Sequence, residues 1–293
     1  MSIDPVIWFF ALGVIAGLAK SDLRMPPAIY DLLSMLLLLT IGLKGGVELA
    51  KSPLAGLLPQ VLAVLAIGFL LPFALFAAAS IANKVSRADA ASLAAHYGSV
   101  SVATFAVGIA FLIDRNVSYD SQMPLFLVLL EVPAIIVGIL IAKRKSAGTR
   151  WGKLLHEIFF GKSIVLLVGG LAIGWAAGPQ GVATFEPLFF DLFKGVLALF
   201  LLEMGLIAAG QAQALRQSGL FLVAFGLLAP VPMGVVGALV GWSIGLNLGG
   251  TTLLAVLAGS ASYIAAPAAM RVAVPEANPS LSLTASLLSL IHI

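Results

Sequence analysis

The sequence contains no cysteine and few charged residues, and both shortages limit what the chain can be. Without cysteine, a disulfide framework and thiol chemistry are excluded. Charged residues fill 10% of the 293 positions, whereas a typical soluble domain has about 25%. The chain is 61% hydrophobic, and its mean hydropathy is +1.11. A soluble fold of this length would need polar surface that is missing here, so we expect an integral membrane protein.

Histidine is also scarce, which argues against a metalloenzyme. The three histidines (His96, His156 and His292) are far apart, and no HExxH spacing occurs. His96 precedes Ser99 and Ser101, but the sequence has no GxSxG motif, no second candidate base and no Asp-rich diphosphate motif. We therefore expect no enzyme and no bound cofactor. The net charge of +3 fits basic loops of a membrane protein and does not indicate a nucleic-acid partner.

Long apolar stretches predict an all-α membrane fold of about ten transmembrane helices. Each stretch has about 20 residues, enough to cross a hydrocarbon layer of about 30 Å. Backbone groups in lipid must be paired within the structure, so the stretches are helices or barrel strands. They are continuous and do not alternate, which excludes the barrel. The expected spans are 5–20, 29–50, 54–82, 88–112, 121–142, 162–178, 187–210, 217–243, 249–271 and one from about 277.

One polar connection divides the chain into two sets of five spans. It runs from Lys143 to Lys162 and contains the basic run Lys143-Arg144-Lys145. We therefore expect a first five-helix repeat at 1–142, a basic cytoplasmic linker at 143–162, and a second five-helix repeat at 163–293.

Short motifs match between the halves. Ile41-Gly42-Leu43 matches Met204-Gly205-Leu206 at an offset of 163, and Gly98-Ser99-Val100-Ser101 matches Gly259-Ser260-Ala261-Ser262 at an offset of 161. A repeat with an odd number of spans must cross the membrane in opposite directions in its two copies. This inverted repeat is typical of secondary transporters. The alternative is chance similarity between helices rich in Gly, Ser and Ala.

The distribution of basic residues predicts the orientation. With ten spans, one face receives most of them, at Lys20, Arg24, Lys84, Arg87, the six within 143–162, Arg216 and Arg271. The other face receives little beyond Lys51, Arg115 and Lys194. The basic face should be cytoplasmic. Both termini then lie outside the plasma (inner) membrane.

The fourth and ninth spans are expected to break into half-helices near the bilayer midplane. Polar groups gather at His96–Thr104 in the fourth span, and Pro267 follows Gly259–Tyr263 in the ninth. Glycine loosens a helix and proline lacks an N–H group. The N-terminus of a half-helix suits a small anion, while freed carbonyls and hydroxyls suit Na⁺. Alternatively, these small residues are ordinary packing positions between membrane helices.

Charged residues inside spans are costly and call for a role. Glu131 lies midway through the fifth span and Glu203 within the seventh. Each could bind a cation, relay a proton, or pair with a basic neighbour such as Lys44 or Lys194. His96 is either a satisfied core histidine or a proton-coupling group.

Four segments resemble the SbtA family of sodium-dependent bicarbonate transporters, in the family's order. They are Ile41-Gly42-Leu43-Lys44-Gly45-Gly46, Tyr97–Ser101 with Val117–Asp120, Glu131-Val132-Pro133-Ala134, and Pro267–Arg271 with Val274–Ser280. The resemblance implies a ten-helix inverted repeat, a homotrimer, a core domain that moves against a gate domain, and Na⁺-coupled bicarbonate uptake.

The family's sites map to the two expected breaks. The residues expected to bind substrate are Gly98, Ser99, Val100, Gly259, Ser260 and Ala261. Those expected to bind sodium are Ser101, Thr104, Ser262 and Glu131, and no other metal is expected.

Three features depart from the family's pattern. Tyr263 stands where family members often have an acidic residue, which removes a cation ligand, and Glu131 replaces an Asp. The linker 143–162 is shorter than usual, which argues against regulation by the family's PII-like cytoplasmic partner.

The last residues look foreign to the fold. After Thr284–Leu287 a tenth span should continue for about 15 residues, yet the chain ends at Ile293. Residues 288–293 read as the translation of a widely used transposon-end sequencing adapter. We expect them to be non-native, the alternative being a short natural last helix.

The sequence thus predicts a secondary active transporter that brings bicarbonate inward with Na⁺ by alternating access. The alternatives are the same fold carrying another small anion, such as a short carboxylate, and a membrane receptor or assembly subunit that transports nothing.

Overall fold

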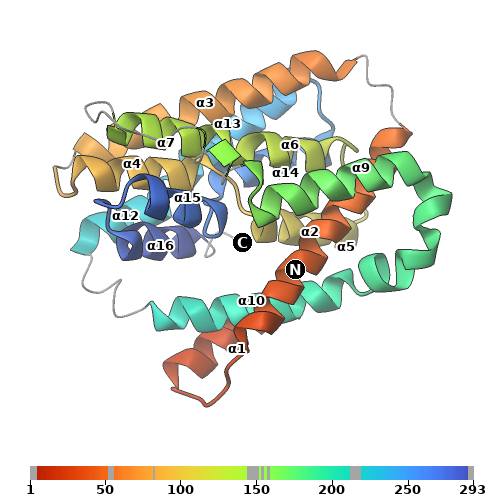
Figure 1. The fold of residues 1–293 in the computed structure, drawn as a ribbon, viewed down its shortest axis with the longest axis horizontal. Helices are drawn as coiled ribbons and strands as arrows, with labels where there is room; N and C mark the ends of the chain where they lie inside the picture. Colours follow the sequence, from red (N-terminus) through yellow and green to blue (C-terminus); the bar gives the residue numbers. More distant parts are fainter. Residues whose placement is uncertain are drawn as a thin grey trace.

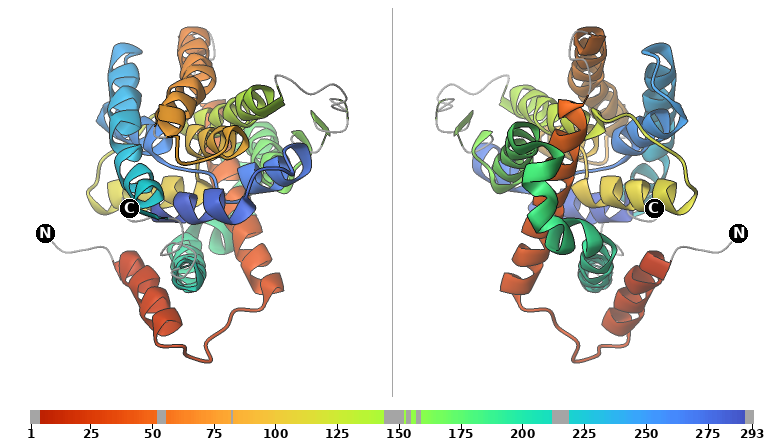
Figure 2. Two further views of the ribbon diagram at one scale, coloured as in Figure 1. Left: turned by 90° about the vertical axis from the view of Figure 1, so that its left-hand side faces the viewer. Right: turned by 90° about the vertical axis from the view of Figure 1, so that its right-hand side faces the viewer.

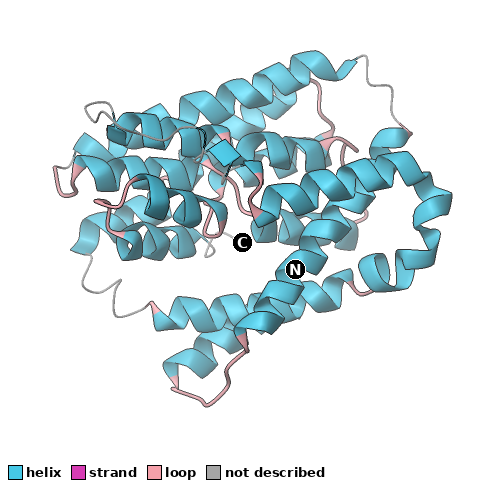
Figure 3. Cartoon of the chain, in the orientation of Figure 1, coloured by secondary structure: helices cyan, strands magenta, loops and turns pink. Residues whose placement is uncertain are grey.

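The protein is described by a computed structural model that covers residues 5–51, 56–81, 83–143, 152, 155–156, 159–211 and 219–289. These residues form helices and connecting turns, without strands (Figure 3). The helices of the first half are α1 (Pro5–Leu18), α2 (Pro27–Ala50), α3 (Leu57–Ile81), α4 (Arg87–Gly98), α5 (Val102–Asp114), α6 (Met123–Glu131) and α7 (Pro133–Lys143). Those of the second half are α9 (Lys162–Val182), η2 (Ala183–Phe185), η3 (Pro187–Asp191), α10 (Phe193–Gly210), α12 (Gly219–Leu228), α13 (Pro230–Ser243), α14 (Leu248–Gly259), α15 (Ala265–Ala273) and α16 (Pro279–Leu288).

Seven helical segments in the described residues are long and apolar enough to cross a membrane. They are Pro27–Ala50, Leu57–Ile81, Arg87–Asp114, Met123–Lys143, Lys162–Phe185, Phe193–Gly210 and Gly219–Ser243. The spans predicted at 5–20, at 249–271 and from about 277 fall on shorter apolar helices, α1, α14 and α16. The secondary structure of the described residues is therefore all helical, as predicted, and several of their helices are long and apolar enough to span a membrane.

Most of the linker predicted at 143–162 lies outside the described residues, as do residues 290–293.

The sixth span, predicted to end at 178, changes direction there. Gly178 has a φ of 63° and is followed by Pro179. Glycine adopts this left-handed conformation without strain, and proline cannot continue the preceding helix's hydrogen bonds. The seventh span was predicted from 187, but residues 187–191 form the short π-helix η3 and α10 begins at Phe193.

The helices divide into two packed groups. In the first, which we call the gate group, α2 packs against α9, α1 packs against α10, and α10 contacts α2. Figure 1 shows α1 and α10 along one edge of the molecule, with α2 and α9 crossing beside them. The second, which we call the core group, contains α3–α7 and α12–α16, where α3 packs on α4 and α13 on α14. The side views in Figure 2 show α1 projecting away from the core group.

Two aspartates fix the ends of helices on which the candidate site depends. Asp120, before α6, accepts a hydrogen bond from the backbone N–H of Asn247, which caps α14 (3.0 Å). Asp89, in the first turn of α4, accepts one from the backbone N–H of Asn278, which caps α16 (2.7 Å). Burial raises the pKa of Asp120, while the bond from Asn247 lowers it. Each contact ties one helix end to a loop far away in the sequence.

Candidate functional site

The chain leaves the helical conformation at two places that touch each other. Residues 99–101 separate α4 from α5, and residues 260–264 separate α14 from α15. The backbone N–H of Ser101 donates to the Ser260 hydroxyl (3.0 Å), and the N–H of Ser262 donates to the carbonyl of His96 (2.8 Å). We call this contact between the two non-helical segments the crossing.

The two segments begin with the same backbone conformation. Ser99, which follows α4, has φ −87° and ψ 176°, and Ser260, which follows α14, has φ −86° and ψ 174°. Both helices end at the glycine that the sequence match paired, Gly98 and Gly259. Pro267 lies within the first turn of α15, where its missing N–H costs little because that group has no intrahelical partner. The proline therefore lies just after the non-helical segment, not at it.

Three hydroxyl groups gather on one side of the crossing. The Ser101 hydroxyl lies 2.9 Å from the Thr104 hydroxyl and 3.0 Å from the Tyr263 hydroxyl. It also accepts the backbone N–H of Thr104 and so caps α5 (3.1 Å). All three side chains are buried. The sequence analysis treated Tyr263 as a lost ligand, whereas the structure places its oxygen beside Ser101, and only the fold could reveal this contact.

Ser262 and Glu131, also predicted to bind sodium, point elsewhere. The Ser262 hydroxyl accepts the backbone N–H of Ala266 (3.2 Å) and stabilises the start of α15. The Glu131 carbonyl accepts a hydrogen bond from Ser99 (2.8 Å), which ties α6 to the crossing. The carboxyl group of Glu131 forms a hydrogen bond with Ser163 at the start of α9. The predicted sodium residues thus do not form one cluster: Ser101 and Thr104 lie together, and Ser262 and Glu131 each point elsewhere.

Glu131 lines a small cavity between the two helix groups. This smaller cavity has a volume of about 260 Å³, and its wall includes Lys162 and Ser163 from α9 and Ala265 and Ala268 from α15. Glu131 is only 2% exposed, and its Oε2 has no hydrogen-bond partner among the described residues. A buried carboxyl oxygen without a partner is costly, so it points to a ligand or a proton in this cavity.

The predicted glycines are packing positions as well as helix ends. A Cβ on Gly98 would lie 2.7 Å from Cγ of Pro72 and 2.9 Å from Cβ of Ala134. A Cβ on Gly259 would lie 2.9 Å from the carbonyl oxygen of Pro230. The neighbouring Val100 and Ala261 are buried. Any ligand contact from these four residues would therefore use their backbone groups.

His96 and Glu203 each have a buried atom without a hydrogen-bond partner among the described residues. The ring Nδ1 of His96 lies 2.7 Å from the carbonyl oxygen of Ser92 on the same helix. Its Nε2, and the Oε2 of Glu203, have no hydrogen-bond partner in the described part of the chain. Lys194, considered above as a partner, lies 3.9 Å from Asp114.

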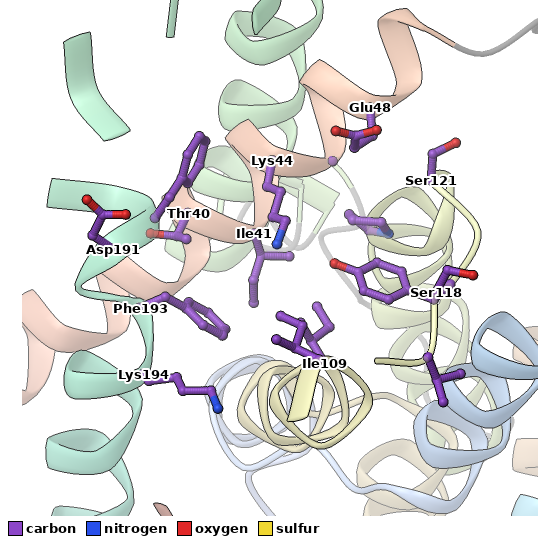
Figure 4. A pocket seen from close by; sticks show the side chains of 16 residues that line it. Thr40, Ile41, Lys44, Glu48, Ile109, Ser118, Ser121, Asp191, Phe193 and Lys194 are labelled. Atoms are coloured by element: carbon purple, nitrogen blue, oxygen red, sulfur yellow. The ribbon is translucent and has the colours of Figure 1, made fainter. Parts of the chain in front are cut away.

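A second, larger cavity separates α2 and α10 from α5. Its volume is about 540 Å³, and Figure 4 shows the side chains that surround it, including Lys44 from α2, Ile109 from α5 and Phe193 from α10. Tyr119 also lines it, and burial raises the pKa of this phenol to about 12, so it is a neutral hydrogen-bond donor at neutral pH. The sequence analysis did not select this cavity. One feature of the sequence could have indicated this cavity: Lys44 is a charged residue within a span, directly after the matched Ile41-Gly42-Leu43.

Seven helical segments of the described part of the chain are long and apolar enough to span a membrane, and two packed helix groups have cavities between them, as expected of a polytopic membrane protein. A family model shows that its class is that of the transporters. The chain belongs to the Na⁺-dependent bicarbonate transporter superfamily, whose model matches residues 5–290. The resemblance stated from the motifs is confirmed, and this is a family of transporters, not of enzymes. No curated protein matches the chain.

Proposed function

We propose that this protein takes up bicarbonate together with Na⁺ by alternating access, through ten spans arranged as two inverted repeats. The crossing is the observation that carries the proposal. Ser101 and Ser262 occupy equivalent positions in the matched tetrads, and His96 and Leu257, two residues before each tetrad, share the same offset of 161. Ser262 donates its N–H directly to the His96 carbonyl, while Ser101 reaches the Leu257 carbonyl through the Ser260 hydroxyl (3.0 and 2.8 Å). Two equivalent links in opposite directions are what an inverted repeat produces.

The gate group supports the same symmetry. A Cβ on Gly13 of α1 would lie 3.0 Å from Cα of Gly205 on α10, and a Cβ on Gly170 of α9 would lie 3.0 Å from Cα of Gly42 on α2. Gly42 and Gly205 are paired by the sequence offset of 163. The first helix of each half therefore packs closely on the second helix of the other half. Small residues allow such close approach between membrane helices.

The crossing offers complementary groups for an anion and a cation. The N-termini of α5 and α15 present backbone N–H groups without intrahelical partners, which suit an oxyanion. In this proposal bicarbonate binds through the backbone of Gly98–Val100 and Gly259–Ala261. Na⁺ binds the hydroxyl oxygens of Ser101, Thr104 and Tyr263 with nearby carbonyls, because hard cations prefer oxygen ligands. Ser262 and Glu131 support the site from α15 and from the smaller cavity.

Ion coupling follows from electrostatics. Moving one negative charge into a cell that is negative inside costs about 2.3 kcal/mol per 100 mV. A co-transported Na⁺ cancels that charge, and its own gradient then drives uptake. In the proposal, the core group carries the crossing past the gate group. The two cavities lie between these groups, which is where access on either side would open.

The proposed orientation places the loop at residues 83–86 in the cytoplasm and the turn at 115–122 outside the plasma membrane, with both termini outside. The larger cavity then belongs to the outer half and the smaller one to the inner half. Assembly as a homotrimer is part of the proposal, and regulation by a PII-like protein is not.

Labelling of single cysteines tests this orientation. Lys84 and Asn116 are exposed turn residues, and the chain has no cysteine of its own. In intact cells a membrane-impermeant maleimide should label Asn116→Cys and should leave Lys84→Cys unlabelled until the membrane is opened. The basic-residue asymmetry predicts this result. Labelling of Lys84→Cys in intact cells would reverse the orientation.

Uptake into proteoliposomes tests the function. With radiolabelled bicarbonate at alkaline pH, where little CO₂ crosses the bilayer, an inward Na⁺ gradient should cause accumulation that an equal K⁺ gradient does not. Stronger competition by formate or acetate than by unlabelled bicarbonate would instead identify a carboxylate carrier. Absence of flux for all of these anions would indicate a receptor or assembly subunit.

A further inference from the structure

The larger cavity is lined by a lysine, Lys44, whose ammonium group has no hydrogen bond or ion pair among the described residues. Lys44 is half-buried on α2 and lines the cavity wall, and Figure 4 shows its side chain pointing inward from that helix. A lysine inside a membrane span without a partner is costly, and such residues mark the path of a substrate or ion.

Two other charged groups of this cavity, Glu48 and Lys194, have ion-pair partners. Glu48, one turn further along α2, is bound to Lys51 at 2.7 Å. Lys194 lies 3.9 Å from Asp114. Asp191 of η3 and Phe193 of α10 also line the cavity. Glu48 is the acid that acts electrostatically on Lys44, and it is already bound to Lys51. The ammonium of Lys44 is therefore available to an anion that enters the cavity.

The rest of the wall suits a small oxyanion. Thr40, on the same face of α2 one turn before Lys44, and Tyr119 bring hydroxyl groups, and Tyr119 stays protonated at neutral pH. Ile41, Ile109 and Phe193 bring apolar surface that excludes water and strengthens charge interactions. At about 30 Å³ per water molecule, 540 Å³ holds an oxyanion with several waters of its hydration shell.

In the proposed repeat, the positive charge of Lys44 has no counterpart in the second half of the chain. At the offset of 163, the counterparts of Thr40 and Lys44 are Glu203 and Ile207 on α10. One half of the chain thus has a hydroxyl and an ammonium group where the other has a carboxyl group and an apolar side chain. The pseudo-symmetric position on the inner side would repel an anion, not hold it.

We propose that Lys44, with Thr40 and Tyr119, forms an anion-binding subsite in the larger cavity that captures a monovalent oxyanion before it reaches the crossing. This inference rests on the proposed function and adds to it a place of first binding on the outer side. Lys44 is a capture residue: it concentrates the anion and sets the apparent affinity for uptake, while the crossing determines the coupling to Na⁺.

Charge removal at Lys44 tests the subsite. Lys44→Met should raise the KM for bicarbonate at least about tenfold and leave the Na⁺ concentration for half-maximal uptake within about twofold, because hydrogen bonds to a charged group are among the stronger ones. Lys84→Met is the control, since it removes the same charge at an exposed position outside the cavity wall and leaves the ion pair of Glu48 intact. An unchanged KM in Lys44→Met, or equal changes in the two variants, would overturn the inference.

A chemical rescue separates charge from folding. Because the chain has no cysteine, Lys44→Cys carries a single thiol. Aminoethyl methanethiosulfonate attaches an ammonium group to this thiol and should restore the low KM, whereas the sulfonatoethyl reagent should raise the KM further. Sodium bicarbonate should also slow the aminoethyl reaction relative to sodium gluconate. If the unmodified wild type shows no Na⁺-dependent bicarbonate uptake, the proposed function fails. If it does show uptake but the ammonium restores nothing and bicarbonate gives no protection, the subsite alone fails.

Discussion

Replacing Gly98 with Val should lower the rate of bicarbonate uptake at least about tenfold, compared at equal amounts of protein in the membrane. A Cβ at this position would lie less than 3 Å from the ring of Pro72 and from Cβ of Ala134, and valine adds two more carbons. Both neighbours belong to helices that hold α4 in place, and their short side chains cannot move aside. Overpacking of this kind typically costs about 1–3 kcal/mol. Because Gly98 ends α4, the displacement would shift Ser99–Ser101 directly.

The matched control is Gly169→Val on α9. No heavy atom outside its own helix lies within 4 Å of the Cβ that this change would add. Gly169→Val should therefore retain uptake and thermal stability close to those of the wild type. Uptake by Gly98→Val at the control's level would show that the end of α4 tolerates bulk, which would contradict the packing described for the crossing.

Replacing Ser101 with Ala should raise the Na⁺ concentration needed for half-maximal uptake at least about tenfold. The Ser101 hydroxyl is the one oxygen in contact with both Thr104 and Tyr263, so its loss removes the centre of the proposed cation site. Each oxygen ligand contributes to binding a hard cation. The measurement is the initial rate of bicarbonate uptake as a function of Na⁺ concentration in proteoliposomes.

The Ser101 hydroxyl also caps α5, and a lost cap costs about 1 kcal/mol by itself. Ser86→Ala controls for this effect, because Ser86 caps α4 in the same way, through the N–H of Asp89 (3.0 Å), at the far end of that helix. Both variants should lose some thermal stability, but only Ser101→Ala should change the Na⁺ dependence. Equal Na⁺ dependence in the two variants would show that the Ser101 hydroxyl acts as a helix cap and does not bind Na⁺.

The positions of the two interruptions could be predicted from sequence because they depend on local chemistry. Gly98 and Gly259 start matching tetrads, and the helices end at these residues. Glycine and serine both have low helix propensity, and each tetrad combines them in a short stretch. The turn at Gly178-Pro179 follows from the same local rules.

Side-chain partners across the fold could not be predicted in this way. Glu131 and Ser262 have the right chemistry for a cation site, yet one points towards Ser163 and the other caps α15. Tyr263 was discounted because it lacks a carboxylate, and only the close approach of α5 brings its hydroxyl to Ser101. The larger cavity depends on how α2, α5 and α10 pack, so a single charge within α2 could not outline it.

Coupling in the reverse direction tests the central claim most directly. In a symporter, either solute gradient must drive the other solute. Proteoliposomes with an inward bicarbonate gradient and equal Na⁺ on both sides should therefore accumulate ²²Na⁺, and Ser101→Ala at the same Na⁺ concentration should accumulate much less. An inward gluconate gradient should give no accumulation. Flux of ²²Na⁺ that is the same with bicarbonate and with gluconate would contradict Na⁺-coupled bicarbonate transport.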